Sequence, residues 1–250
     1  MHVPNIARIA WRGTTFAFAL VYDAWRYMHE VRGVSGAGER AARARWLHRC
    51  SRRAMRVLNI HLTVRGPLPD GGLVAANHLS YLDIVSLSAA LPCVFVSKLE
   101  VADWPLFGMF ARRSGTLFLD RGRRHAVGGV AEQMREVLAS GLPLVFFPEG
   151  TSTDGEGVLP FKTSLFEPVA ELSCPVIAAA IDYALPCGGS VRDEIHWWGT
   201  MSLVPHVLNL FGKRRVEVTI RFGEQRPRTG DRKAIARELH DEVVTLRTAR

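Results

Sequence analysis

A histidine and an aspartate lie five positions apart in the segment "AANHLSYLD", residues 75–83. On one ideal α-helix, two residues at this spacing point about 140° away from each other, because each residue turns the helix by about 100°. If the helix instead begins after Ser80, Asp83 lies in its first turn, where the helix dipole favours a carboxylate. Ser80 and Asp83 then form a capping box. His78 then lies on the loop before the helix and can turn back toward Asp83.

A histidine that is held by a carboxylate can act as a general base. Such a base takes a proton from a hydroxyl group or a water molecule and contributes roughly 10²–10⁴-fold in rate. Asp83 would hold the tautomer of the His78 ring and stabilise the imidazolium. The sequence contains no G-x-S-x-G nucleophile elbow, and Ser80 lies too close to His78 along the chain to be the nucleophile of a triad. The pair therefore indicates a base that activates the acceptor substrate itself.

Further polar residues follow other apolar segments of the chain. They are Lys98 at the end of "CVFVSK", the group Arg121, Arg123 and Arg124 after "GTLFLD", and Glu149, Gly150 and Thr151 after "PLVFFP". The cations could bind phosphate, and the carboxylate could accept hydrogen bonds from hydroxyl groups of an acceptor. Taken singly, each group also has an ordinary explanation, such as a solvated basic loop or a polar turn. Together they indicate transfer onto a hydroxyl group of a phosphorylated molecule.

The segments before these polar residues have the composition of strands. Seven segments are short, rich in β-branched residues and bounded by Gly, Pro or Asn. They are residues 57–66, 72–77, 93–98, 115–120, 143–148, 175–181 and 214–223. Between and after them, residues 127–138 and 235–243 carry apolar side chains at helical spacing. This alternation predicts an α/β sheet covered by helices, in which the loops after the strands gather at one edge.

The N-terminal region predicts an amphipathic helix over residues 5–31. Its uncharged stretch covers only residues 13–22, well short of the ~20 residues that span a bilayer. Two stripes lie on different sides of this helix, one with Arg8, Arg12 and Arg26 and the other with Trp11, Phe18 and Trp25. Arginine opposite tryptophan is typical of a helix that lies in a membrane interface. An ordinary amphipathic helix packed on the domain is the alternative.

The charge of the chain favours anionic partners. The formal net charge is +8, and nearly all of the positive charge is arginine. An anionic bilayer, a phosphate ester, an acidic carrier protein and nucleic acid all fit this balance. A non-catalytic basic binding protein would not need His78, Asp83 and Glu149 at strand ends, and no nucleic-acid-binding module is recognisable, so we expect an enzyme and no nucleic acid. The four cysteines have no zinc-ligand spacing, so we expect no metal.

Four segments in order resemble the four successive motifs of the glycerolipid acyltransferase family, whose type member is 1-acylglycerol-3-phosphate acyltransferase. They are "NHLSYLD" at 77–83, "SGTLFLDR" at 114–121, "FPEGTSTDG" at 147–155 and "CPVIAAAIDY" at 174–183. The resemblance spans about residues 57–223. It implies transfer of a fatty acyl group from acyl-CoA or acyl-carrier protein to a lysolipid hydroxyl, without a cofactor, a metal or a covalent acyl-enzyme.

The resemblance also implies the fold and the location of the protein. It implies a mixed, mostly parallel sheet flanked by helices, with an N-terminal helical membrane-docking element. We therefore expect residues 1–56 to form amphipathic helices that dock onto a membrane and residues 57–250 to form the α/β acyltransferase domain. The expected location is the cytoplasmic face of the inner membrane, as a monotopic or peripheral protein on an anionic surface.

Residue by residue, the resemblance makes His78 the general base and Asp83 its partner. Arg121 is implied to bind the phosphate of the acceptor, and Lys98 matches a basic position that can also meet phosphate. The residues implied to bind or line the acceptor site are Glu149, Gly150 and Thr151.

One position departs from the family pattern. The third motif commonly continues from Gly-Thr to an arginine that binds phosphate, whereas this chain has Ser152. A hydroxyl group cannot supply the bidentate charged contact of a guanidinium. We expect 1-acylglycerol-3-phosphate as the acceptor, giving phosphatidic acid. Other lysolipids that carry a head group, such as lyso-ornithine lipid, stay open.

Overall fold

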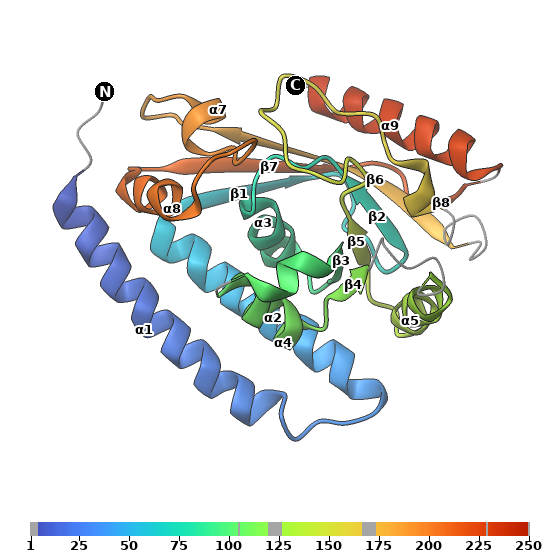
Figure 1. Cartoon of the computed structure of the whole chain (residues 1–250), viewed down its shortest axis with the longest axis horizontal. Coiled ribbons are helices and arrows are strands. Elements are labelled where there is room, and N and C mark those ends of the chain that lie inside the picture. The colour runs from blue at the N-terminus through green and yellow to red at the C-terminus, as the bar shows by residue number, and fades with distance from the viewer. Residues whose placement is uncertain (1–4, 105, 120–126, 167–173, 229, 250) are drawn as a thin grey trace.

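A sheet of eight strands forms the centre of the described part of the protein (Figure 1). The computed structural model describes residues 5–104, 106–119, 127–166, 174–228 and 230–249. The strands are β1 (Ile60–Arg65), β2 (Leu73–Ala76), β3 (Val94–Lys98), β4 (Leu117–Leu119), β5 (Leu144–Phe146), β6 (Pro175–Ala184), β7 (Val216–Phe222) and β8 (Arg226–Pro227). All seven predicted strands are present, and β8 is the one that the sequence pattern did not indicate.

The strand order is β1-β7-β6-β2-β5-β3-β4, and β8 pairs with β6. Strand β6 is antiparallel to β7 and β8, whereas the other neighbouring pairs run parallel. The predicted mixed, mostly parallel sheet is therefore confirmed. Because β2, β5, β3 and β4 are parallel, the segments that follow their carboxyl ends start from the same edge of the sheet.

Helices cover both faces of the sheet. They are α1 (Ile6–Glu30), α2 (Ala37–Leu58), α3 (Leu82–Ala90), α4 (Phe107–Ser114), α5 (Val127–Ala139), α7 (Val191–Glu194), α8 (Leu203–Gly212) and α9 (Arg232–Thr248), with short 3₁₀ turns η1 (Leu99–Asp103) and η3 (Thr163–Phe166). Strand β2 shows why its sequence is apolar throughout: Leu73 and Ala75 pack with α5 and α9, whereas Val74 and Ala76 pack with α2 and α3 on the other face. A strand that is buried on both faces needs no polar alternation.

The two N-terminal helices form a hairpin that packs on the rest of the protein. Trp46 of α2 is fully buried in the same apolar cluster as the sheet, and its indole N–H donates to the carbonyl of Asp23 in α1 (2.9 Å). Helix α2 ends at Leu58 and is capped by Asn59, whose φ of 56° is in the left-handed region. The first predicted strand thus starts three residues later than expected, because residues 57 and 58 complete the helix.

Two arginines of the α1 stripe, Arg8 and Arg12, face the protein. The Arg12 side chain is buried and donates to the carbonyls of Phe211 (3.2 Å) and Lys213, and Arg8 donates to the carbonyl of Gly212 (2.8 Å). These carbonyls lie at the end of α8, where backbone acceptors have no partner within the helix and cations are favoured. Arg8 and Arg12 therefore attach α1 to α8.

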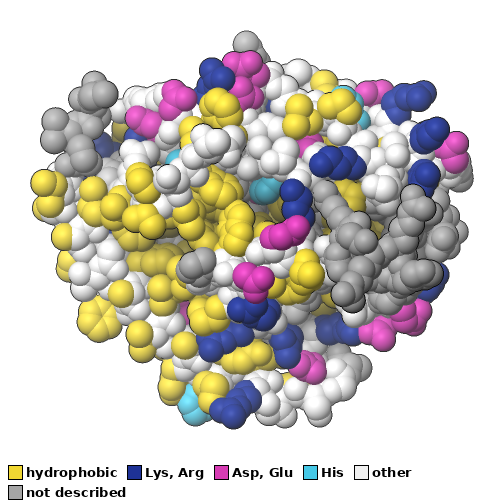
Figure 2. All heavy atoms as spheres, viewed as in Figure 1, with side chains coloured by type: hydrophobic (Ala, Val, Ile, Leu, Met, Phe, Trp, Pro, Cys, Tyr) yellow, Lys and Arg dark blue, Asp and Glu magenta, His cyan; other side chains and the backbone are white. Residues whose placement is uncertain are grey.

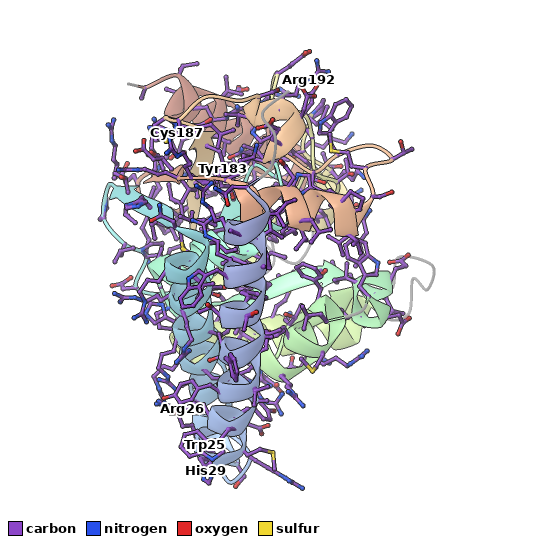
Figure 3. All side chains as sticks on the ribbon, turned by 90° about the vertical axis from the view of Figure 1, so that its left-hand side faces the viewer. Trp25, Arg26, His29, Tyr183, Cys187 and Arg192 are labelled. Atoms are coloured by element: carbon purple, nitrogen blue, oxygen red, sulfur yellow. The ribbon has the colours of Figure 1, made fainter. Side chains whose placement is uncertain are left out.

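The tryptophan stripe of α1 faces outward, as the sequence predicted. Trp11, Phe18 and Trp25 are exposed, and Trp11 leaves 73% of its surface accessible. Hydrophobic side chains gather on the left of Figure 2, where Figure 1 shows α1 and α8. Figure 3 shows Trp25, Arg26 and His29 at one end of α1. None of the helices in the described ranges is long and apolar enough to cross a membrane.

The contact between α1 and α8 predicts a measurable loss of stability. Replacing Arg12→Met removes the guanidinium and leaves the carbonyls of Phe211 and Lys213 without that donor, so we expect the free energy of unfolding to fall by about 1–3 kcal/mol. Urea denaturation measures the change. The control is Arg45→Met on the exposed side of α2, which should stay within about 0.5 kcal/mol of wild type. Equal stabilities of the two variants would contradict the assigned role of Arg12.

Candidate active site

The segment between β2 and α3 begins with an asparagine that prolongs the sheet. Asn77 is fully buried; its side-chain oxygen accepts from the backbone N–H of Ile181 (2.7 Å), and its amide nitrogen donates to the carbonyl of the same residue (3.0 Å). The side chain thus replaces the next pair of backbone bonds between β2 and β6. His78 follows at the carboxyl edge of the sheet.

Backbone hydrogen bonds hold the loop that carries His78. The N–H of His78 donates to Glu149 Oε1 (2.7 Å), and its carbonyl accepts from the N–H of Thr153 (3.0 Å). The carbonyl of the next residue, Leu79, accepts from the N–H of Trp197 (2.8 Å). Because paired buried backbone groups resist movement toward unpaired positions, the imidazole is presented on a rigid support.

Asp83 is the carboxylate to which this loop is attached. Its side chain is 0% exposed. Oδ2 accepts from His78 Nδ1 (2.7 Å) and from the backbone N–H groups of Leu79 (2.6 Å) and Ser80 (2.9 Å). The predicted approach of His78 to Asp83 is therefore confirmed. With Nδ1 bound to a carboxylate, Nε2 is the nitrogen that can accept a proton from a substrate.

The predicted capping box forms only in part. Asp83 accepts from the N–H of Ser80, but Ser80 Oγ is buried and has no hydrogen-bond partner among the described residues. Helix α3 begins at Leu82 rather than directly after Ser80. The second oxygen of Asp83, Oδ1, accepts from the hydroxyl of Tyr183 (2.7 Å).

Tyr183 is a site residue that sequence reasoning missed. It lies near the end of β6, 100 positions from Asp83, and is buried. Burial and the nearby Asp83 carboxylate raise the pKa of Tyr183 well above its ordinary value. The hydroxyl therefore keeps its proton and donates it in a hydrogen bond. The signal in the sequence was a tyrosine near the end of the otherwise apolar segment "CPVIAAAIDY".

Glu149 lies behind the His78 loop. It is 1% exposed, and burial raises the pKa of its carboxyl group. Oε1 accepts from the N–H of His78, and Oε2 accepts from the N–H of Leu159, each at 2.7 Å. Both oxygens thus hold backbone groups, one from each of two loops. This geometry fits a residue that positions His78, whereas the sequence had suggested contact with the acceptor.

The other predicted substrate-binding residues lie at the same edge or outside the described residues. Lys98 ends β3, in register with Leu119 at the end of β4. Gly150 and Thr151 follow β5; Gly150 has φ +72°, and Thr151 is exposed. Arg121, Arg123 and Arg124 fall outside the described residues. Ser152, at the position of the expected arginine, donates its hydroxyl to the carbonyl of Trp197 and thus joins two loops.

An apolar pocket of about 270 Å³ opens beside His78. His78 and Phe147 both line it, and their rings stack with centroids 4.1 Å apart. Other lining residues come from α1, α2 and α4 and include Phe16, Leu20, Leu47, Ala54, Phe107 and Phe110. Such walls suit an alkyl chain. Within the described ranges, no group of three or more His, Cys, Asp or Glu residues could hold a metal ion.

The hydrogen bonds of Glu149 predict that replacing its carboxylate with an amide lowers the stability of the protein. In Glu149→Gln the NH₂ group faces a backbone N–H donor, either that of His78 or that of Leu159, so one donor loses its acceptor. We expect the free energy of unfolding to fall by about 1–3 kcal/mol at neutral pH, measured by urea denaturation. Glu224→Gln, at an exposed position, is the matched control. A Glu149→Gln protein as stable as wild type would refute this role.

Comparison with known proteins assigns the chain to a family. The family model named Acyltransferase matches residues 59–182. The chain is 36% identical to the lyso-ornithine lipid O-acyltransferase of Brucella abortus over 76% of this chain and 77% of the relative. It is also 36% identical to the 1-acyl-sn-glycerol-3-phosphate acyltransferase of Neisseria gonorrhoeae, over 61% of each chain.

A solved structure supports the fold. The crystal structure of the 1-acyl-sn-glycerophosphate (LPA) acyltransferase PlsC from Thermotoga maritima matches 98% of this chain and 97% of its own, with a TM-score of 0.66 at 20% sequence identity. The expected fold class is thus confirmed by a second route. The family model and these relatives show that this chain belongs to the acyltransferase family that acylates lysolipids.

Proposed function

We propose that this acyltransferase moves a fatty acyl group from a thioester to the free hydroxyl of a lysolipid, with His78 as the general base. The observation that carries the proposal is the His78–Asp83 hydrogen bond (2.7 Å) beside an apolar pocket. The alternative of a non-catalytic basic binding protein is set aside, because the chain belongs to an enzyme family.

The chemistry follows from the two nitrogens of His78. Nε2 removes the proton of the lysolipid hydroxyl as the oxygen attacks the thioester carbonyl carbon. The C–O bond forms, the C–S bond breaks, and the imidazolium returns the proton to the leaving thiolate. Asp83, hydrogen-bonded to Nδ1, stabilises the imidazolium between these steps. The transfer consumes no cofactor, and the donor is acyl-CoA or acyl-carrier protein.

Two lysolipids are candidate acceptors. The first is 1-acylglycerol-3-phosphate, which would give phosphatidic acid. The second is lyso-ornithine lipid, on which the relative from Brucella abortus, 36% identical over 76% of this chain, acts according to its name. The side chain of Ser152 favours the second, because its hydroxyl is bound to the carbonyl of Trp197 and supplies no charge for a phosphate.

The exposed face of α1 supports a peripheral position on a membrane. Trp11, Phe18 and Trp25 project from one side of the helix, and Val204 and Leu208 of α8 are exposed as well. Tryptophan side chains favour the boundary between head groups and acyl chains. We place the protein on the cytoplasmic face of the inner membrane, where anionic lipids attract a chain with a net charge of +8.

The general base is tested by replacing it. His78→Ala should lower the rate of acyl transfer by at least about 10²-fold, because alanine cannot take the proton from the hydroxyl. The assay supplies long-chain acyl-CoA or acyl-carrier protein with a panel of lysolipids and follows the diacyl product by mass spectrometry. His61→Ala, at an exposed position of β1, is the matched control with expected wild-type turnover. Wild-type turnover by His78→Ala would disprove the mechanism.

The membrane contact is tested separately. Replacing Trp11, Phe18 and Trp25 together by serine removes three large apolar side chains from the surface. We expect most of the protein to remain unbound when it is floated with vesicles of anionic phospholipid, while wild type floats with them. The control is Leu68→Ser, which changes an exposed apolar residue outside α1. Unchanged flotation of the triple variant would exclude this face as the docking surface.

A further inference from the structure

The side chain of Lys162 packs against the backbone of Gly150. A methyl group at the Cβ position of Gly150 would lie 2.7 Å from Lys162 Nζ and 3.0 Å from its Cδ and Cε atoms. Real Cβ atoms do not approach other heavy atoms that closely, so a side chain at position 150 would displace the lysine. The positive φ of Gly150 (+72°) also favours glycine. Because Gly150 has no side chain, the side chain of Lys162 can pack against the backbone at this point.

Backbone hydrogen bonds hold Lys162 at this place. Its N–H donates to the carbonyl of Pro148 (2.9 Å), which is two residues before Gly150. Three residues earlier in the chain, the N–H of Leu159 donates to Glu149. The loop that leaves β5 therefore returns to its own start, and Lys162 lies where it closes.

A series of short contacts connects Lys162 to the general base, His78. Lys162 lies against Gly150, Gly150 is bonded to Glu149, and Glu149 accepts from the N–H of His78 at 2.7 Å. Lys162 does not line the apolar pocket that His78 lines. The cation and the pocket therefore belong to different parts of the site, one suited to a charged head group and the other to an acyl chain.

Lys162 carries its charge at an exposed position. Its side chain is exposed, and within the described ranges no carboxylate forms an ion pair with it. The adjacent carboxylate, Glu149, is buried and already accepts two backbone N–H groups. The ammonium group of Lys162 is therefore accessible to an anion from the solvent.

We propose that Lys162 binds the anionic group of the lysolipid acceptor, a phosphate or a carboxylate, in place of the arginine that Ser152 replaces. The inference rests on the proposed function and names a residue that selects its acceptor. An ammonium group is a compact point charge with rotatable donors, which pairs with either kind of anion without requiring a bidentate geometry. A site built on Lys162 therefore accepts a carboxylate as well as a phosphate.

The test compares KM and kcat of Lys162→Ala with wild type for three acceptors. These are 1-acylglycerol-3-phosphate, lyso-ornithine lipid, whose ornithine carries a carboxylate, and an uncharged monoacylglycerol. We expect KM for the anionic acceptor that wild type uses to rise about tenfold or more, with kcat within about threefold and KM for the acyl donor unchanged. The acceptor whose KM responds shows whether the ligand is phosphate or carboxylate.

Three further variants make the test specific. Lys162→Arg should restore KM to within about threefold of wild type, because it keeps the charge. Gly150→Ala should reproduce the rise in KM, because the new methyl group displaces the lysine. Lys233→Ala, which removes an exposed lysine on α9, should behave as wild type, and melting temperatures of all variants establish that they are folded.

The outcomes separate this inference from the proposed function. If wild type acylates a lysolipid and Lys162→Ala keeps the wild-type KM for it, the inference is overturned and the proposed function stands. A fall in kcat alone, or an equal rise in KM for the uncharged acceptor, also overturns it. If wild type acylates no lysolipid, the proposed function itself fails, and this is visible before any variant is made.

Discussion

The buried carboxylate of Asp83 is the interaction on which the site depends. An ionised carboxylate that is fully removed from water is costly unless hydrogen bonds replace its hydration. Asp83 receives four, from His78 Nδ1, the N–H groups of Leu79 and Ser80, and the hydroxyl of Tyr183. Three of these donors come from the loop before α3 and one from β6, whereas Asp83 itself lies in the first turn of α3, so the carboxylate is satisfied only when loop, helix and strand are all in place. Orientation of His78 is thereby coupled to the fold.

Hydrogen bonds and apolar packing also fix the surroundings of the base. Glu149 holds the N–H of His78 from one side, and Thr153 and Trp197 hold the carbonyls of the loop from the other. Helix α1 contributes to two surfaces at once: Phe16 and Leu20 line the apolar pocket, whereas Trp11 and Phe18 point outward. Arg8 and Arg12, bound to the end of α8, keep the helix in that orientation. Helix α1 thus offers apolar side chains to a lipid on two of its faces, the exposed face and the face that lines the pocket.

Local patterns explain which parts could be predicted. The seven strands and the His78–Asp83 contact were legible because β-branched runs and a five-residue spacing are short-range signals. Tyr183 and the supporting role of Glu149 were not, since these residues reach the loop across 100 and 71 positions of sequence. The arginine stripe of α1 was visible as a stripe, but its partner, the end of α8, is about 200 positions away. The position of Lys162 could not be predicted, because its side chain packs in the space that a side chain at Gly150 would fill, 12 positions earlier in the sequence.

The most direct measurement is a double-mutant cycle of acyl transfer with His78→Ala, Asp83→Ala and the double variant. If Asp83 acts through His78, as the hydrogen bond between them indicates, the double variant will be no slower than His78→Ala alone. Losses that multiply in the double variant would contradict the account, because they would mean that the two residues act independently.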